Sequence, residues 1–77
     1  MWFTYMILCE DKSIYTGITT DLKRRFKEHK EGRGANYTKS HKPVKYLYKE
    51  KFKNRSLALK REAEIKSWKR EKKLAII

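Results

Sequence analysis

The sequence has few residues that form covalent or metal cross-links. Cys9 is the only cysteine among 77 residues, so the chain forms no internal disulfide and holds no cysteine-rich zinc site. Glycine and proline are also scarce: the chain has three glycines and one proline. We find neither repeats nor a linker. The length predicts a single domain over residues 1–77, with a core that buries only roughly 60% of the unfolded chain's surface.

Acidic residues are few compared with basic ones. Nine Asp and Glu stand against 21 Lys and Arg, a formal net charge of +12. This excess predicts a polyanionic partner, with nucleic acid the first candidate and an anionic membrane surface the second. The sequence has no apolar run of about 18 residues, and Met1 to Cys9 lacks the features of a secretory signal. We therefore expect a cytoplasmic protein with no membrane partner.

Two β-like segments open the chain. Trp2 to Cys9 is almost wholly apolar or aromatic, which is typical of a central strand covered on both faces. A polar turn over Glu10 to Ser13 follows. Ile14 to Thr19 then returns with β-branched residues, so the pair predicts an antiparallel hairpin.

Tyr5 and Tyr15 are the two polar aromatics of this hairpin. They share a face if odd positions pair with odd positions, because strand side chains alternate with period two. Gly17 would then leave open space beside Tyr15 for a backbone or a ligand. The alternative is that both tyrosines simply pack half-buried with their hydroxyl groups in water.

A first helix is predicted over Leu22 to Glu31, with capping residues before it and Gly32 after it. At roughly 100° per residue, Arg25 and His29 fall on the side of the apolar stripe that contains Phe26. Both side chains can therefore point toward the hairpin. An arginine that snorkels at the edge of the stripe and an ordinary boundary histidine are the alternatives.

The next segment, Gly32 to Lys42, has no apolar periodicity and predicts a loop. Its glycines, cations and aromatic suit phosphate contact with base stacking, although a solvated connector fits as well. The candidate nucleic-acid-binding residues are Arg33, Tyr37, Lys39, His41 and Lys42. Val44 to Phe52 then predicts a lysine-rich edge strand that begins after Pro43.

A second long helix is predicted from a cap at Asn54 or Ser56 to about Lys69. Its apolar stripe consists of Leu57, Ala58, Ile65 and Trp68. Glu62 and Glu64 lie on opposite flanks of that stripe, and periodicity does not choose between them. Glu62 also has the spacing of an ordinary surface pair with Lys66.

We expect the segment from Glu71 to Ile77 to form a short basic helix or a frayed end. We expect its apolar members to close over the core; they are Leu74, Ile76 and Ile77.

The chain resembles the GIY-YIG nuclease family, which is named for two tripeptides on adjacent strands. These stand here as Phe3-Thr4-Tyr5 and Tyr15-Thr16-Gly17. The likeness covers nearly the whole chain and is closest to small bacterial stand-alone members. It rests also on the ordered residues that follow, namely Arg25, His29, Tyr37 and Glu62. There are two departures: Phe3 replaces the glycine of the first tripeptide, and no asparagine follows Asn54.

The resemblance implies an α/β fold, a small three-stranded antiparallel sheet flanked by helices in the order β-β-α-β-α-α. It implies that Tyr5 and Tyr15 lie near the attacking water, where nearby cations favour a phenolate. It places Arg25 on the scissile phosphate and gives His29 the task of assisting a phenol. Of the two glutamates, it selects Glu62 as the ligand of one Mg²⁺ or Mn²⁺ ion.

The function expected from these features is a divalent-metal-dependent endonuclease that hydrolyses DNA phosphodiester bonds with little sequence specificity. Larger family members carry separate targeting domains, so a protein partner would supply targeting here. A nucleic-acid-binding module without catalysis is the first alternative. A subunit that completes a larger nuclease or ribosome-associated assembly is the second.

Overall fold

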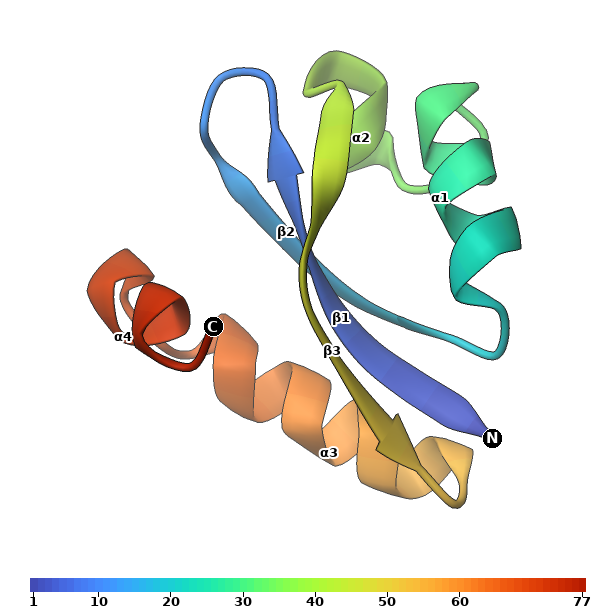
Figure 1. Cartoon of the computed structure of the whole chain (residues 1–77), viewed down its shortest axis with the longest axis vertical. Coiled ribbons are helices and arrows are strands. Elements are labelled where there is room, and N and C mark those ends of the chain that lie inside the picture. Colours follow the sequence, from blue (N-terminus) through green and yellow to red (C-terminus); the bar gives the residue numbers. More distant parts are fainter.

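The computed structural model describes residues 1–77, with three strands and four helices (Figure 1). In chain order they are β1 (Trp2–Cys9), β2 (Ile14–Thr19), α1 (Leu22–Lys30), α2 (Asn36–Ser40), β3 (Pro43–Phe52), α3 (Arg55–Lys66) and α4 (Arg70–Ala75). The predicted α/β class and three-stranded antiparallel sheet are confirmed. The short helix α2 is an addition to the predicted order. None of the helices has the length and apolarity to cross a membrane.

The sheet has the order β2-β1-β3, so β1 is the central strand, as its apolar sequence predicts. In the β1–β2 pair, Tyr5 lies opposite Gly17 and Ile7 lies opposite Tyr15. Odd positions therefore pair with odd positions, and Tyr5 and Tyr15 share one face of the sheet. Tyr5 and Ile7 have no exposed surface.

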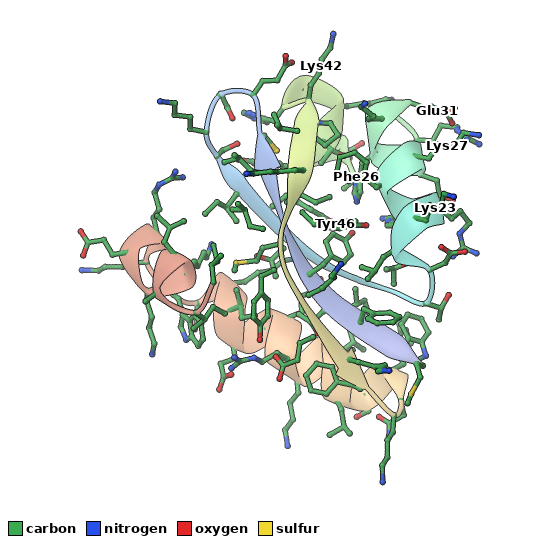
Figure 2. The ribbon with its side chains drawn as sticks, in the orientation of Figure 1. Lys23, Phe26, Lys27, Glu31, Lys42 and Tyr46 are labelled. Atoms are coloured by element: carbon green, nitrogen blue, oxygen red, sulfur yellow. The ribbon has the colours of Figure 1, made fainter.

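A register shift in the β1–β3 pair interrupts the regular alternation of side-chain directions along β3. Met6 pairs with Tyr48, but Ile7 pairs with Tyr46, so one residue of β3 is skipped. The two tyrosines consequently lie on opposite faces of the sheet. Figure 2 shows Tyr46 with Phe26 in the layer between α1 and the sheet, and their ring centroids are 5.2 Å apart.

The two faces of the sheet carry different helices, with α1 and α3 on opposite sides of it (Figure 1). On the α1 side, the Tyr46 hydroxyl donates a hydrogen bond to the carbonyl of Leu22 at 2.6 Å. On the α3 side, the buried Thr4 hydroxyl donates to the carbonyl of Ala58 at 2.8 Å. The face of the odd positions of β1 is therefore the one that α1 covers.

Side-chain caps fix the beginnings of α1 and α3. The Asp21 carboxylate accepts from the amide of Arg24 at 3.0 Å, and the Asn54 side chain accepts from the amide of Leu57 at the same distance. After α1, Gly32 has a φ of +77°, the left-handed conformation that ends helices. Helix α3 ends at Lys66 rather than at about Lys69.

The predicted apolar stripe of α3 is partly wrong. Ala58 and Ile65 are fully buried against the sheet, whereas Leu57 is exposed and Trp68 lies beyond the end of the helix. The Trp68 indole has two cations near it, with Arg61 Cζ at 5.1 Å and Lys72 Nζ at 4.6 Å from the centroid of its ring. These contacts attach α4 to α3.

The expectation that the C-terminal apolar residues close over the core is wrong for two of the three. Leu74 and Ile77 are exposed, Ile76 is half-buried, and α4 buries no residue completely. The reason is that α3 already covers this face of the sheet through Ala58 and Ile65.

Candidate active site

The Tyr5 hydroxyl lies at the centre of a buried cluster between β1 and α1. Its oxygen is 2.8 Å from Nε2 of His29 and accepts a hydrogen bond from Nε of Arg25 at 3.4 Å. Tyr5 and His29 are fully buried. The one-turn spacing of Arg25 and His29 on α1 brings both side chains to the same phenol, as the helix periodicity predicts.

Gly17 lets the two motif tyrosines approach each other. A Cβ at this position would lie 2.6 Å from the Tyr5 hydroxyl oxygen and 3.0 Å from a ring carbon of Tyr15. The centroids of the two tyrosine rings are 6.3 Å apart. The open space expected beside Tyr15 is therefore absent, because the two phenols fill it.

Burial keeps the cluster uncharged at Tyr5. Loss of solvent raises the pKa of Tyr5 well above its usual value of 10.0, and this effect outweighs the hydrogen bond from Arg25, which lowers it. Arg25 favours the phenolate, as expected, but not enough to produce it in the protein alone.

His29 is likewise neutral near pH 7. Burial, together with the positive charge of Arg25, lowers its pKa from 6.5 to about 4, and Glu28 opposes this only in part. The polar core of the site is therefore a neutral phenol bonded to a neutral imidazole.

Arg25 reaches from this core toward the surface. Its Nη1 donates to the Glu28 carboxylate at 3.1 Å, and 27% of its side chain stays exposed. Its neighbour Arg24 is 58% exposed and contacts only the far oxygen of Glu28 and the Thr20 hydroxyl. Of the two neighbouring arginines, only Arg25 contacts the tyrosine.

The segment predicted as a loop, Gly32 to Lys42, contains α2. This five-residue helix buries Thr38, whose Oγ1 lies 2.7 Å from Nδ1 of His29. Sequence reasoning missed Thr38, because a lone threonine in a polar segment has no periodic or chemical signal. The correction is that this segment packs against His29 rather than remaining a free connector.

The candidate nucleic-acid-binding residues of this segment are in different surroundings. Tyr37 stacks on Tyr15 at 5.8 Å and on His41 at 4.2 Å between ring centroids. His41 contacts the carboxylate of Asp11, which fixes it to the β1–β2 turn. Arg33 is exposed and pairs with Glu31. Tyr37 and His41 therefore extend the tyrosine cluster, while Arg33 lies outside it.

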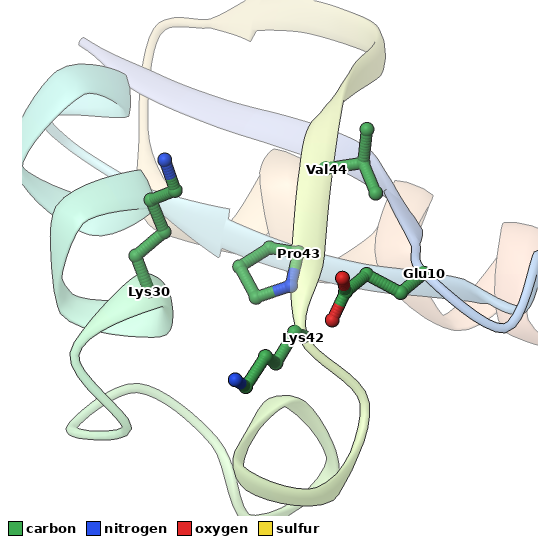
Figure 3. Close-up of a pocket in the computed structure, with 5 residues that line it drawn as sticks. All are labelled: Glu10, Lys30, Lys42, Pro43 and Val44. Atoms are coloured by element: carbon green, nitrogen blue, oxygen red, sulfur yellow. The ribbon is translucent and has the colours of Figure 1, made fainter.

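Lysines 39 and 42 are exposed to solvent. Lys42 borders a cavity of about 460 Å³ at the beginning of β3 (Figure 3). The cavity is lined by Glu10, Lys30, Lys42, Pro43 and Val44. None of the tyrosines and neither arginine of α1 lines it, so this cavity is separate from the cluster around Tyr5.

Glu62 lies on α3, half-buried, and is connected to the tyrosines through a lysine. Its Oε2 is 3.5 Å from Nζ of Lys66, and the same ammonium lies 5.9 Å from the centroid of the Tyr15 ring. Glu64 is more exposed and pairs instead with Arg61. Of the two glutamates, Glu62 is the one whose surroundings reach the motif tyrosines.

No group of three or more His, Cys, Asp or Glu side chains converges anywhere in the structure. Glu62 is therefore not part of a cluster of three such ligands, and the metal ligand that the family resemblance implies is this one carboxylate. This donor set still fits Mg²⁺ or Mn²⁺, because such ions are often held by one or two carboxylates together with water and substrate phosphate oxygens. The carboxylate of Glu62 has only a solvent-exposed lysine as its partner.

Comparison with known proteins identifies the class. Residues 1–75 match the family model of the GIY-YIG catalytic domain, and the chain belongs to this family. Membership supports a nuclease-type function and an interaction with nucleic acid, and GIY-YIG nucleases are generally dependent on a divalent metal.

Similar proteins carry the family designation UPF0213. One from Haloquadratum walsbyi is 52% identical over 71 residues, which cover 92% of this chain and 80% of that protein. One from Staphylococcus saprophyticus is 47% identical over 75 residues, covering 97% and 92%. The solution NMR structure of a UPF0213 protein from Bacillus halodurans matches with a TM-score of 0.61 and 38% identity, covering 99% of this chain and 82% of that one.

Proposed function

We propose that this protein is a divalent-metal-dependent endonuclease that hydrolyses DNA phosphodiester bonds with little sequence specificity. The observation that carries the proposal is the position of the Tyr5 hydroxyl, which contacts both Nε of Arg25 and Nε2 of His29. A phenol bonded to a proton acceptor and placed beside a partly exposed guanidinium suits proton transfer next to a phosphate.

Arg25 is the phosphate-binding group in this proposal. Charge grows on the phosphoryl oxygens as water attacks, and a planar guanidinium can offset that charge through two parallel hydrogen bonds. The Nε and Nη1 atoms of Arg25 are held by Tyr5 and Glu28, so the guanidinium is oriented before substrate arrives. Its exposed part remains for the phosphate.

The two tyrosines and His29 take up the proton that the attacking water loses. Water loses a proton as its oxygen bonds to phosphorus, while the bond from phosphorus to the leaving oxygen breaks. Tyr5 accepts that proton as it gives its own to Nε2 of His29, and Tyr15 borders the same place. General base catalysis of this kind is worth roughly a hundred- to ten-thousand-fold.

Access to Tyr5 requires a rearrangement. Tyr5 has no exposed surface in the protein alone, whereas Tyr15 is half-buried at the edge strand β2. Substrate binding must therefore separate the contact between the two rings before water reaches the Tyr5 oxygen. The stacked Tyr37 on the outer side of Tyr15 is the neighbour that has to move with it.

Glu62 is the residue that would hold the divalent ion. Bound there, the ion would supply charge neutralisation at the phosphate and stabilise the leaving oxygen. The chain's own task at this position is to present the Glu62 carboxylate, which is now paired with the ammonium of Lys66. That ammonium, 5.9 Å from the centroid of the Tyr15 ring, has to withdraw from the carboxylate when the ion binds.

The substrate class follows from charge. A net charge of +12 on 77 residues favours contacts with the phosphates of DNA. Such contacts bind DNA without distinguishing its sequence. The cationic side chains beside the two motif tyrosines are Arg25 and Lys66, both with exposed surface.

The test is a cleavage assay with purified protein on plasmid, single-stranded and branched DNA, and on RNA of matching sequence, with Mg²⁺ or Mn²⁺. We expect DNA to be nicked and the reaction to stop when a chelator is added. Binding to all these substrates without cleavage in either metal would favour the alternative, a nucleic-acid-binding module without catalysis. The pairing of Glu62 with Lys66 is the observation that fits that alternative.

A further inference from the structure

Both ring nitrogens of His29 have a hydrogen-bond partner, Nδ1 as well as Nε2. Nδ1 lies 2.7 Å from Oγ1 of Thr38, and Thr38 is buried, with 2% of its surface exposed. The same hydroxyl lies 3.0 Å from the carbonyl oxygen of Ala35. Tyr5, His29, Thr38 and the Ala35 carbonyl thus form one continuous chain of hydrogen bonds from β1 to the beginning of α2.

Only one arrangement of protons satisfies every donor in this chain. If Nδ1 of His29 carries the proton, it donates to Thr38, Thr38 donates to the Ala35 carbonyl, and the Tyr5 hydroxyl donates to Nε2. If Nε2 carried the proton, Nε2 and Arg25 would both donate to the Tyr5 oxygen. The hydroxyl hydrogen of Tyr5 would then have no acceptor in a fully buried place, which is costly.

The backbone of Gly34 packs directly against the imidazole ring of His29. A Cβ on Gly34 would lie 2.2 Å from Nδ1 and 2.8 Å from Cγ of His29, so no other residue fits there without displacing the ring. The backbone of Gly34 and the hydroxyl of Thr38 therefore confine His29 together. The amide of Ala35 also donates to Thr38 Oγ1, at 3.3 Å, which orients that hydroxyl.

We propose that Thr38 is a positioning residue that holds His29 in the tautomer protonated at Nδ1, so that Nε2 is the acceptor for the proton of Tyr5. The segment between α1 and β3 thus acts on the chemistry through His29, in addition to any contact it makes with nucleic acid. The catalytic consequence rests on the proposed function, whereas the tautomer itself does not.

The tautomer is measured by nitrogen-15 NMR of the histidine side chains, with the two histidines assigned through His41→Gln. In the wild type we expect His29 to carry its proton on Nδ1, with Nε2 in the acceptor form. Thr38→Ser keeps a hydroxyl and should keep this pattern. Thr38→Val keeps the shape but removes the partner of Nδ1, so we expect the single tautomer to be lost.

A wild-type spectrum with the proton on Nε2 would overturn the proposal, and so would a folded Thr38→Val variant with an unchanged tautomer. If Thr38→Val does not fold, the wild-type and Thr38→Ser spectra still decide the matter. Under cleavage conditions Thr38→Val should lower kcat about tenfold or more at similar KM, and Thr38→Ser should restore it. If the tautomer behaves as expected but the wild type cleaves no substrate, the proposed function fails while the role of Thr38 in setting the tautomer stands.

Discussion

The hydroxyl oxygen of Tyr5 lies 2.8 Å from Nε2 of His29, which connects the middle of the central strand to the last turn of α1. Neither side chain has exposed surface. A polar pair in this position stabilises the fold only while His29 stays uncharged, because a buried imidazolium would lose its hydration and lie close to Arg25. The stability of the domain should therefore depend on pH through His29.

The first prediction concerns this pH dependence. The unfolded chain takes up a proton at His29 near pH 6.5, but the folded protein does so only near pH 4. Between these values the unfolded state binds more protons, so the free energy of unfolding should fall as the pH is lowered from about 6.5 to about 4. The loss is about 3 kcal/mol at most. Urea denaturation at a series of pH values measures it.

Two variants separate His29 from other titrating groups. His29→Gln should flatten the curve between about pH 6.5 and 4.5, whereas His41→Gln should leave the fall in place. Asp11 acts in a lower window, because hydrogen bonds from Ser13 and His41 lower its pKa to about 2. Its contribution is present above pH 3.8 and is lost as the pH falls toward 2. Equal slopes for the wild type and His29→Gln would contradict the prediction.

The second prediction concerns the two adjacent arginines of α1. Arg25→Ala should reduce cleavage by about a hundredfold or more, because it removes the guanidinium held between Tyr5 and Glu28. DNA binding should survive in part. Arg24→Ala removes a charge of the same sign from the exposed side of the helix and should change cleavage only a few-fold. Similar losses from both substitutions would mean that charge, not position, explains the effect.

The third prediction concerns Lys66, which now contacts the carboxylate proposed for the metal. Lys66→Met should bind Mn²⁺ a few-fold more tightly, since an exposed helix pair of this kind is worth only about 0.3–0.5 kcal/mol and a nearby positive charge is also removed. Paramagnetic resonance of free Mn²⁺ measures the affinity without any cleavage. Lys60→Met is the matched control on the same helix. If both variants bind Mn²⁺ alike, Lys66 does not compete for Glu62.

The fourth prediction concerns the way in which DNA is bound. If about five phosphates are neutralised, the logarithm of affinity for duplex DNA should fall with the logarithm of salt concentration at a slope of roughly −4 to −5. Duplexes of unrelated sequence should give the same slope and similar affinities. Fluorescence anisotropy over a range of salt measures both. Affinity that does not respond to salt would contradict an interaction based on the charge of the protein.

Much of the fold is predictable because its main signals are local. The apolar run of β1 identifies the central strand, and the short polar turn after it predicts an antiparallel hairpin with β2. That Tyr5 and Tyr15 share one face is conditional on the register, which the structure supplies by pairing Tyr5 with Gly17. The spacing of Arg25 and His29 on α1 identifies the two helical residues that contact Tyr5. Short-range geometry is sufficient for each of these predictions.

The features that the sequence does not reveal depend on tertiary contacts. The register shift near Tyr46 has no glycine or proline to mark it, and it turns Tyr46 toward Leu22 and Phe26 of α1. Helix α2 is too short to show a period. The role of Thr38 depends on a tertiary contact, because the threonine hydroxyl bonds to His29 in the last turn of α1. The choice of Glu62 over Glu64 likewise needed the family resemblance, since both lie on flanks of the same stripe.

The most direct test of the nuclease proposal compares Glu62→Gln with Glu64→Gln in a single-turnover cleavage assay with Mg²⁺ or Mn²⁺. The substitutions remove the same charge from one helix, but only Glu62 pairs with Lys66, whose ammonium lies 5.9 Å from the centroid of the Tyr15 ring. We expect Glu62→Gln to lose cleavage while its DNA binding stays equal or becomes tighter, and Glu64→Gln to cleave like the wild type. Full cleavage by Glu62→Gln, or an equal loss in both variants, would contradict the proposal.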